Sequence, residues 1–209
     1  VEYARSFWEI GRWILLTNIL AVILVQLFPW TLKLFHGPEA TASFQVIVNV
    51  LGVSNPILFS LGTLIIPAIT QADAQGNRAD WSEIAQGYAL PLGCILLLYY
   101  FVLIIWPQEI LAVFYGADSP YLAAGLETPL RYLVLAHIMI FFAVVLQSVL
   151  YGLKKTRAVF LVHLFSTSLG LVIGIPLASS GDVLGACKAL ALIQCVSVTL
   201  SFWFLRNER

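Results

Sequence analysis

Residues 132–153 read YLVLAHIMIFFAVVLQSVLYGL, a run of 22 residues without a single Asp, Glu, Lys or Arg. A helix needs about 20 mostly apolar residues to cross the hydrocarbon layer of a bilayer. Similar charge-free runs recur along the chain, at residues 13–32, 40–72, 84–108, 158–181 and 189–205. Six such runs predict an all-α polytopic membrane protein with six transmembrane helices, not a soluble domain.

The amino-acid composition also predicts a membrane protein. Hydrophobic residues make up 60% of the chain and charged residues 11%, whereas a soluble globular chain is about 25% charged. Eleven basic residues balance eleven acidic ones, so we expect no nucleic-acid partner. The chain opens on Val1 and continues with charged residues that fit no signal peptide. We therefore expect it to be a piece of a longer protein.

The charge-free runs predict a single six-helix lobe over residues 1–209, with an interfacial segment at about 108–129. The second run is 33 residues long and contains Pro56 and Pro67. Proline removes a backbone donor and disturbs a helix, so we expect one kinked helix that ends near Pro67. The expected spans are about 13–32, 41–67, 84–106, 132–153, 158–178 and 184–205.

The positions of the basic residues predict that both termini are cytoplasmic. Six spans place both ends of the chain on one side, and cytoplasmic segments carry an excess of Lys and Arg. The opposite side holds Lys33 and at most Arg131 and Lys188. The side with the termini collects eight basic residues, namely Arg5, Arg12, Arg78, Lys154, Lys155, Arg157, Arg206 and Arg209.

A polar stripe within the second span is the first candidate for a functional site. Gln45, Asn49, Gly52 and Pro56 recur at helical spacing on one face, and Asn55 lies at the kink. Polar groups inside a span are expensive and face a helix bundle or a water-filled path. One interpretation is that the amides bind a neighbouring helix. The other is a substrate path beside a bend at Pro56, which the mid-span Gly and Pro favour slightly.

Three further residues are candidates for the same path: Arg131, His137 and Lys188. Arg131 can extend to the outer headgroups, whereas Lys188 has less room to do so. Either side chain, facing an aqueous cavity, would attract an anionic group such as a phosphate. His137 and His163 lie in the fourth and fifth spans, where a lone histidine more often contacts a helix than relays protons.

The sequence contains no pattern typical of catalysis. It lacks a nucleophile elbow, a Walker sequence and a pair of carboxylates within the charge-free runs. Cys94, Cys187 and Cys195 lie in apolar runs without metal-ligand spacing. We therefore expect a protein that is not an enzyme and has no metal or cofactor.

Several local patterns follow one another in a characteristic order. They are FWEIGRW at 7–13, LIIPA at 64–68, PQEIL at 107–111, FYGAD at 114–118 and LQSVLYGL at 146–153. In this order they resemble the C-terminal half of the multidrug/oligosaccharidyl-lipid/polysaccharide (MOP) exporter superfamily, in particular its polysaccharide (O-antigen) flippase branch. The resemblance covers nearly the whole chain.

The resemblance implies one lobe of a two-lobe transporter in the bacterial inner membrane. Its partners would be a missing N-terminal lobe of the same chain, membrane lipids and a lipid-linked glycan, which is moved across the membrane by alternating access. A drug/cation antiporter of the same superfamily is an alternative, which the lack of intramembrane carboxylates disfavours. A non-transporting membrane scaffold subunit is the other. A mid-span aqueous cavity at Gln45 and Asn49 would distinguish a transporter from a scaffold.

Overall fold

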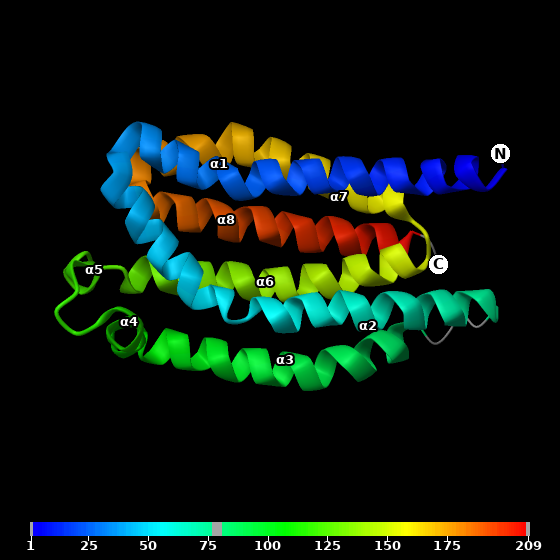
Figure 1. The fold of residues 1–209 in the computed structure, drawn as a ribbon, viewed down its shortest axis with the longest axis horizontal. Coiled ribbons are helices and arrows are strands. Elements are labelled where there is room, and N and C mark those ends of the chain that lie inside the picture. The colour runs from blue at the N-terminus through cyan, green and yellow to red at the C-terminus, as the bar shows by residue number, and fades with distance from the viewer. Residues whose placement is uncertain (1, 77–80, 208–209) are drawn as a thin grey trace.

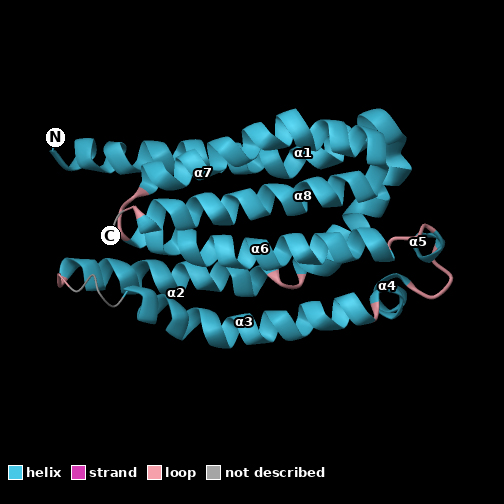
Figure 2. Cartoon of the chain, turned by 180° about the vertical axis from the view of Figure 1, so that it is seen from behind, coloured by secondary structure: helices cyan, strands magenta, loops and turns pink. Residues whose placement is uncertain are grey.

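The computed structural model describes residues 2–76 and 81–207, which form helices and connecting turns without any strand (Figure 2). Apolar, charge-free sequence accounts for this, because a helix satisfies its own backbone hydrogen bonds. The elements are α1 (Glu2–Gly52), α2 (Asn55–Ala74), α3 (Trp81–Ile105), α4 (Pro107–Tyr115), α5 (Pro120–Ala123), α6 (Glu127–Gly152), α7 (Thr156–Leu169), the π-helix η2 (Gly170–Gly174) and α8 (Ile175–Arg206).

Five helical stretches of the described chain are long and apolar enough to cross a bilayer, which confirms the prediction of a helical, multi-pass membrane protein. Two of them, of 42 and 51 residues, are about twice as long as a bilayer requires. The five stretches are Gly11–Gly52, Asn55–Ala74, Trp81–Ile105, Glu127–Gly152 and Thr156–Arg206.

Both overlong stretches fold back on themselves at a residue with non-helical backbone angles. Gly37 has φ 85° and ψ −175° within α1, and Asp182 has φ 53° and ψ −144° within α8. Glycine adopts positive φ without steric cost, and Pro38 then starts the returning helix with a preset φ. Figure 1 shows α1 running from the N-terminus to the far end of the bundle, where the chain turns back. The return after Asp182 is tight, because a Cβ on Gly185 would lie 2.0 Å from the Leu177 carbonyl oxygen.

The sequence predicts a second span at 41–67, and this region divides between the returning part of α1 and α2. Helix α2 continues through Pro67 to Ala74. Proline is tolerated inside membrane helices where neighbouring groups satisfy the freed backbone. The predicted interfacial segment, 108–129, contains the short helices α4 and α5, which lie at one end of the bundle (Figure 1).

The start of α1, the α6–α7 turn and the end of α8 lie together at the other end of the bundle (Figure 1). Arg12, Lys154, Arg157 and Arg206 belong to this end and are exposed. Two residues of the predicted basic group, Arg78 and Arg209, lie outside the described residues.

Helix α6 is the centre of the packing, since it lies against α8, α2 and α3. Glycines allow the helices to approach closely, as is usual in membrane bundles. A Cβ placed on Gly152 would lie 2.6 Å from Cβ of Ile69 and 3.1 Å from the carbonyl oxygen of Ile66. Gly152 therefore sets the spacing between α6 and α2.

We predict that Gly152→Ala lowers the thermal stability of the protein in detergent. The added methyl group must displace Ile69 or the α2 backbone, and overpacking of this kind costs about 1–3 kcal/mol. Gly87→Ala is the matched control, because nothing lies within 4 Å of a Cβ at this helical glycine. A melting temperature unchanged by Gly152→Ala would contradict the close contact of α2 and α6.

Candidate functional site

After the reversal at Gly37, α1 returns toward the middle of the bundle as far as Gly52, and α2 continues from Asn55. We call this second part of α1 together with α2 the returning limb. It is interrupted at Val53–Ser54, between the end of α1 and the start of α2.

Backbone and side-chain donors both pair with the carbonyls at this break. The Val53 and Ser54 N–H groups donate to the Val50 and Leu51 carbonyls at 3.4 and 3.0 Å. The Ser54 hydroxyl adds a second bond to the Leu51 carbonyl at 2.6 Å, and the Tyr99 hydroxyl of α3 donates to the Val50 carbonyl at 2.5 Å. Unpaired carbonyls are costly in lipid, and these two carbonyls remain paired where the limb is interrupted.

Pro56 lies in the first turn of α2. A helix has no intrahelical partner for its first N–H groups, so proline is well tolerated there. The flexible bend predicted at Pro56 is therefore a break of two residues, Val53 and Ser54, followed by a new helix.

A cavity of about 370 Å³ lies beside this break. Both limbs of α1, the start of α2, and helices α6 and α8 contribute to its walls. Its polar lining residues are Gln26, Gln45, Asn55, His137 and Gln194. Its apolar lining includes Phe28, Phe44, Val48, Leu133, Ile140 and Leu190.

The amide groups lie on the open side of the bundle. Gln45, Asn49 and Asn55 are exposed in this chain, and the Gln45 side-chain NH₂ donates to Oδ1 of Asn49 at 3.1 Å. An amide carries both donors and acceptors, which lipid chains cannot satisfy. This face must therefore contact water or protein, and not the hydrocarbon of the bilayer.

His137 contributes to the cavity wall from α6. Its Nδ1 lies 3.0 Å from the carbonyl oxygen of Leu133, one turn earlier in the same helix. Its ring meets the Tyr100 ring of α3 edge-on, with centroids 6.3 Å apart. These two contacts fix the orientation of the imidazole at the cavity wall.

The structure brings four of the eight predicted path residues together, since Gln45, Gly52, Asn55 and His137 all line the cavity. Asn49 joins them through its hydrogen bond to Gln45. Pro56 is next to Asn55 in the chain but does not belong to the lining. The role of these residues in a substrate path stays a prediction.

The two predicted basic residues lie outside the cavity lining. The Arg131 Nε donates to the Ile104 carbonyl at the end of α3, at 3.2 Å. The Lys188 Nζ lies 5.4 Å from the centre of the Tyr132 ring, and both Arg131 and Lys188 are exposed. Consequently no charged side chain of the described chain lines this cavity.

The sequence interpretation missed two cavity residues, Gln26 and Gln194. Each is a glutamine inside a charge-free run, so the cost of a polar group in a span was a signal for both. What the sequence could not reveal is that α1 and α8 turn these amides toward the same space as Gln45.

A second polar group lies elsewhere in the bundle and joins three helices. Nε2 of His163 in α7 is 3.2 Å from Oε1 of Gln147 in α6, and the Gln147 NH₂ donates to the Ser197 hydroxyl of α8 at 3.3 Å. These contacts support the interpretation of His163 as a helix–helix contact. Among residues 2–76 and 81–207, no three His, Cys, Asp or Glu side chains are grouped so that they could hold a metal ion.

A multi-pass helical bundle with a broken limb beside a polar mid-bundle cavity is an arrangement typical of membrane transporters. Comparison with known families gives a more specific assignment. The model of the MatE family matches residues 14–175, so the chain belongs to the MatE family, which is part of the MOP superfamily of membrane transporters. No curated protein and no solved structure matches the chain.

We predict that a cysteine at Gln45 reacts with a water-soluble maleimide, whereas one at Ile95 reacts far more slowly. Both positions are exposed in this chain and lie roughly two to three helical turns from the bundle end that carries α4. A thiol in hydrocarbon does not form the reactive thiolate. The measurement is the labelling rate in proteoliposomes, with Cys94, Cys187 and Cys195 replaced. Equal slow labelling at both positions would show that the cavity is dry.

Proposed function

We propose that this chain is one lobe of a flippase that moves a lipid-linked oligosaccharide or polysaccharide precursor across the bacterial inner membrane by alternating access. The observation that carries the proposal is the amide-lined cavity beside the break at Val53–Ser54. In transporters, substrates bind near the middle of the membrane, where broken helices expose backbone and polar side chains.

The chemistry of the cavity suits a neutral glycan. Gln26, Gln45, Asn55 and Gln194 offer side-chain donors and acceptors, which match the hydroxyl groups of a sugar. These amides avoid the large desolvation cost of a buried charge. The volume of about 370 Å³ lies within the range of small-ligand sites. We propose binding and translocation only, with no catalytic step.

The alternative of a drug/cation antiporter has less support from this site. A cation is held in a membrane by carboxylates or by several carbonyl oxygens, and the described lining contains no carboxylate. A scaffold subunit would use the amides to bind another helix. The open amide face therefore needs either a solvated path with a second lobe or a tightly packed partner, and we propose the former.

In this proposal a second lobe faces the amides, supplied by a further part of the same protein or by a second copy. Alternating access requires two bundles that move against each other around a shared site. One bundle supplies half of such a site. The exposure of Gln45, Asn49 and Asn55 is what a lobe with its partner removed would present.

We propose six membrane crossings with both termini cytoplasmic. The reversals at Gly37 and Asp182 divide the two overlong stretches. The start of α1, the α6–α7 turn and the end of α8 lie at one end of the bundle (Figure 1), and these segments contain Arg12, Lys154, Lys155, Arg157 and Arg206. In intact cells, an impermeant thiol reagent should label Pro120→Cys and leave Gln75→Cys unlabelled, since these exposed positions lie at opposite ends. Labelling of Gln75→Cys alone would invert the orientation.

The proposed function predicts that Gln45→Leu and Asn49→Leu each reduce surface glycan in cells that depend on this protein, while membrane abundance stays normal. Leucine keeps the size of the amide and removes its hydrogen bonds. An interhelical hydrogen bond in a membrane averages only about 0.6 kcal/mol, so loss of packing alone would change abundance little. Gln86→Leu is the control, because Gln86 is an exposed amide in the second turn of α3 and lies outside the cavity lining.

Normal glycan export in both variants would refute the substrate path. Reduced abundance of both proteins would show that each amide contributes more to folding than one average hydrogen bond, and would assign the amides to helix packing. If export of a cationic drug fell while glycan export did not change, the antiporter alternative would replace the flippase.

A further inference from the structure

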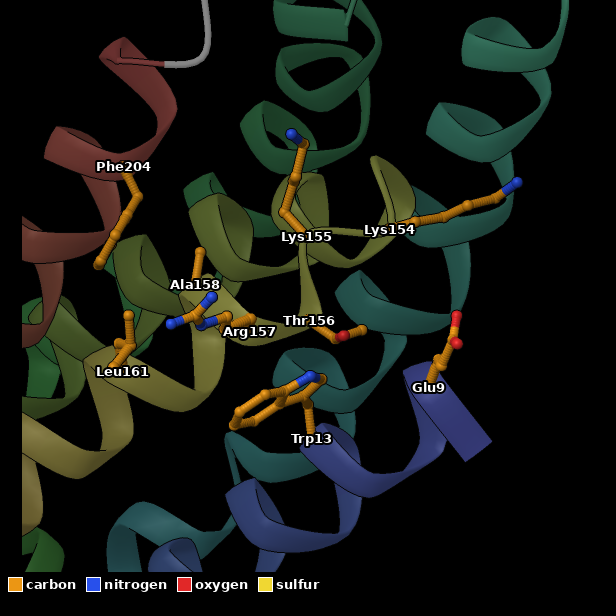
Figure 3. Close-up of a pocket in the computed structure, with 9 residues that line it drawn as sticks. All are labelled: Glu9, Trp13, Lys154, Lys155, Thr156, Arg157, Ala158, Leu161 and Phe204. Carbon is orange, nitrogen blue, oxygen red and sulfur yellow. The ribbon is translucent and has the colours of Figure 1, made fainter. Parts of the chain in front are cut away.

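A second pocket, of about 450 Å³, lies at the bundle end that carries both termini, separate from the amide-lined cavity. The start of α1, the α6–α7 turn, the start of α7 and the end of α8 form its walls (Figure 3). Its lining residues are Glu9, Trp13, Lys154, Lys155, Thr156, Arg157, Ala158, Leu161 and Phe204. Nothing in the proposed transport function uses this pocket.

The polar part of the pocket is strongly basic. Three of the four positions from 154 to 157 carry positive side chains, at Lys154, Lys155 and Arg157, against one carboxylate at Glu9. The turn that presents them is held rigidly. The backbone N–H of Lys154 donates to the Tyr151 carbonyl at 2.9 Å, and that of Lys155 donates to the Leu150 carbonyl at 2.8 Å.

Lys154 adopts φ 59°, a left-handed conformation that is uncommon for a residue with a side chain. Here it belongs to the turn that ends α6, because a left-handed residue with these two backbone hydrogen bonds is a common way for a helix to end. This cap determines where the basic side chains of the turn leave the backbone.

Thr156 adds a hydroxyl to this basic wall. The residue is only 5% exposed and lines the pocket. Thr156 is also the first residue of α7, a helix of 14 residues. The first backbone N–H groups of a helix have no intrahelical acceptor, and they favour an anion.

The remainder of the pocket is aromatic and apolar. The Arg157 guanidinium carbon lies 5.8 Å from the centre of the Trp13 ring, which also meets the Phe160 ring at 5.1 Å. Figure 3 shows Arg157 and Thr156 beside Trp13, with Leu161 and Phe204 continuing the wall toward α8. A tryptophan at the end of a membrane bundle lies at the level of the lipid headgroups.

We propose that this pocket binds the phosphate headgroup of an anionic phospholipid. Arg157, the Thr156 hydroxyl and the first N–H groups of α7 hold the phosphate beside Trp13, and Lys154 and Lys155 add positive charge around the pocket. The apolar surface of Leu161 and Phe204, toward which Arg157 extends, receives the glycerol and the first acyl carbons. Basic pockets between membrane helices are sites for anionic lipid headgroups. A free phosphate would gain nothing from the apolar wall. The site is independent of the proposed transport function.

The test compares lipid binding to the purified full-length protein by native mass spectrometry, with phosphatidylglycerol and phosphatidylcholine as probes. We expect phosphatidylglycerol to bind roughly tenfold more tightly, because it carries a net negative charge. Arg157→Gln should weaken its binding roughly fivefold, as expected for the loss of one basic residue near the headgroup. Arg131→Gln, which alters an exposed arginine at the opposite end, should leave it unchanged.

Two further variants separate binding from folding. Thr156→Val keeps the buried volume and removes the hydroxyl, so it should weaken phosphatidylglycerol binding, whereas Thr156→Ser should retain it. If Thr156→Val lowers the melting temperature, the Arg157→Gln variant decides the outcome, since Arg157 is exposed.

Equal binding of the two lipids, or unchanged binding in Arg157→Gln, would overturn the proposal. Inorganic phosphate serves as the second probe. Displacement of phosphatidylglycerol by millimolar phosphate would overturn the lipid assignment and indicate a site for a soluble phosphate. Persistence of lipid binding under those conditions supports the headgroup site. Surface glycan in the Gln45 and Asn49 variants reports on transport separately.

Discussion

The constraint on which this fold depends is that hydrocarbon satisfies no backbone hydrogen bond, so the chain must satisfy its own. Long helices are the result, and every departure from them is compensated locally. Gly37 in α1 and Asp182 in α8 have non-helical backbone angles, and the chain reverses direction at each of them. At Val53–Ser54, the Val50 and Leu51 carbonyls keep backbone N–H donors, and the hydroxyls of Tyr99 and Ser54 add further bonds to them.

The same constraint determines what can lie beside the exposed amides. On a soluble protein, Gln45, Asn49 and Asn55 would be ordinary surface residues. In a membrane bundle they require water or protein beside them, and they line or adjoin a cavity at the broken limb. Membership of the MatE family assigns such an arrangement to a transporter. The neutral lining then favours a substrate that hydrogen-bonds over one that carries positive charge.

The two ends of the bundle differ in chemistry. One end carries the reversals and the short helices α4 and α5, whereas the other gathers the termini and the basic α6–α7 turn. The pocket over Trp13 and Thr156 lies at this basic end and shares no lining residue with the amide-lined cavity. An anchored headgroup there would fix the bundle against the lipid surface while the cavity face remains free to move.

The sequence by itself determined the helical, membrane-spanning class and the clustering of polar groups at Gln45 to Asn55, because charge-free length and helical spacing are properties of one segment. Tertiary structure alone decided which helices share a cavity. It added Gln26 and Gln194, left Arg131 and Lys188 outside, and replaced the bend at Pro56 by a break. Spacing fixes which residues share a face of one helix, but the rotation of each helix about its axis depends on packing, such as the contact at Gly152.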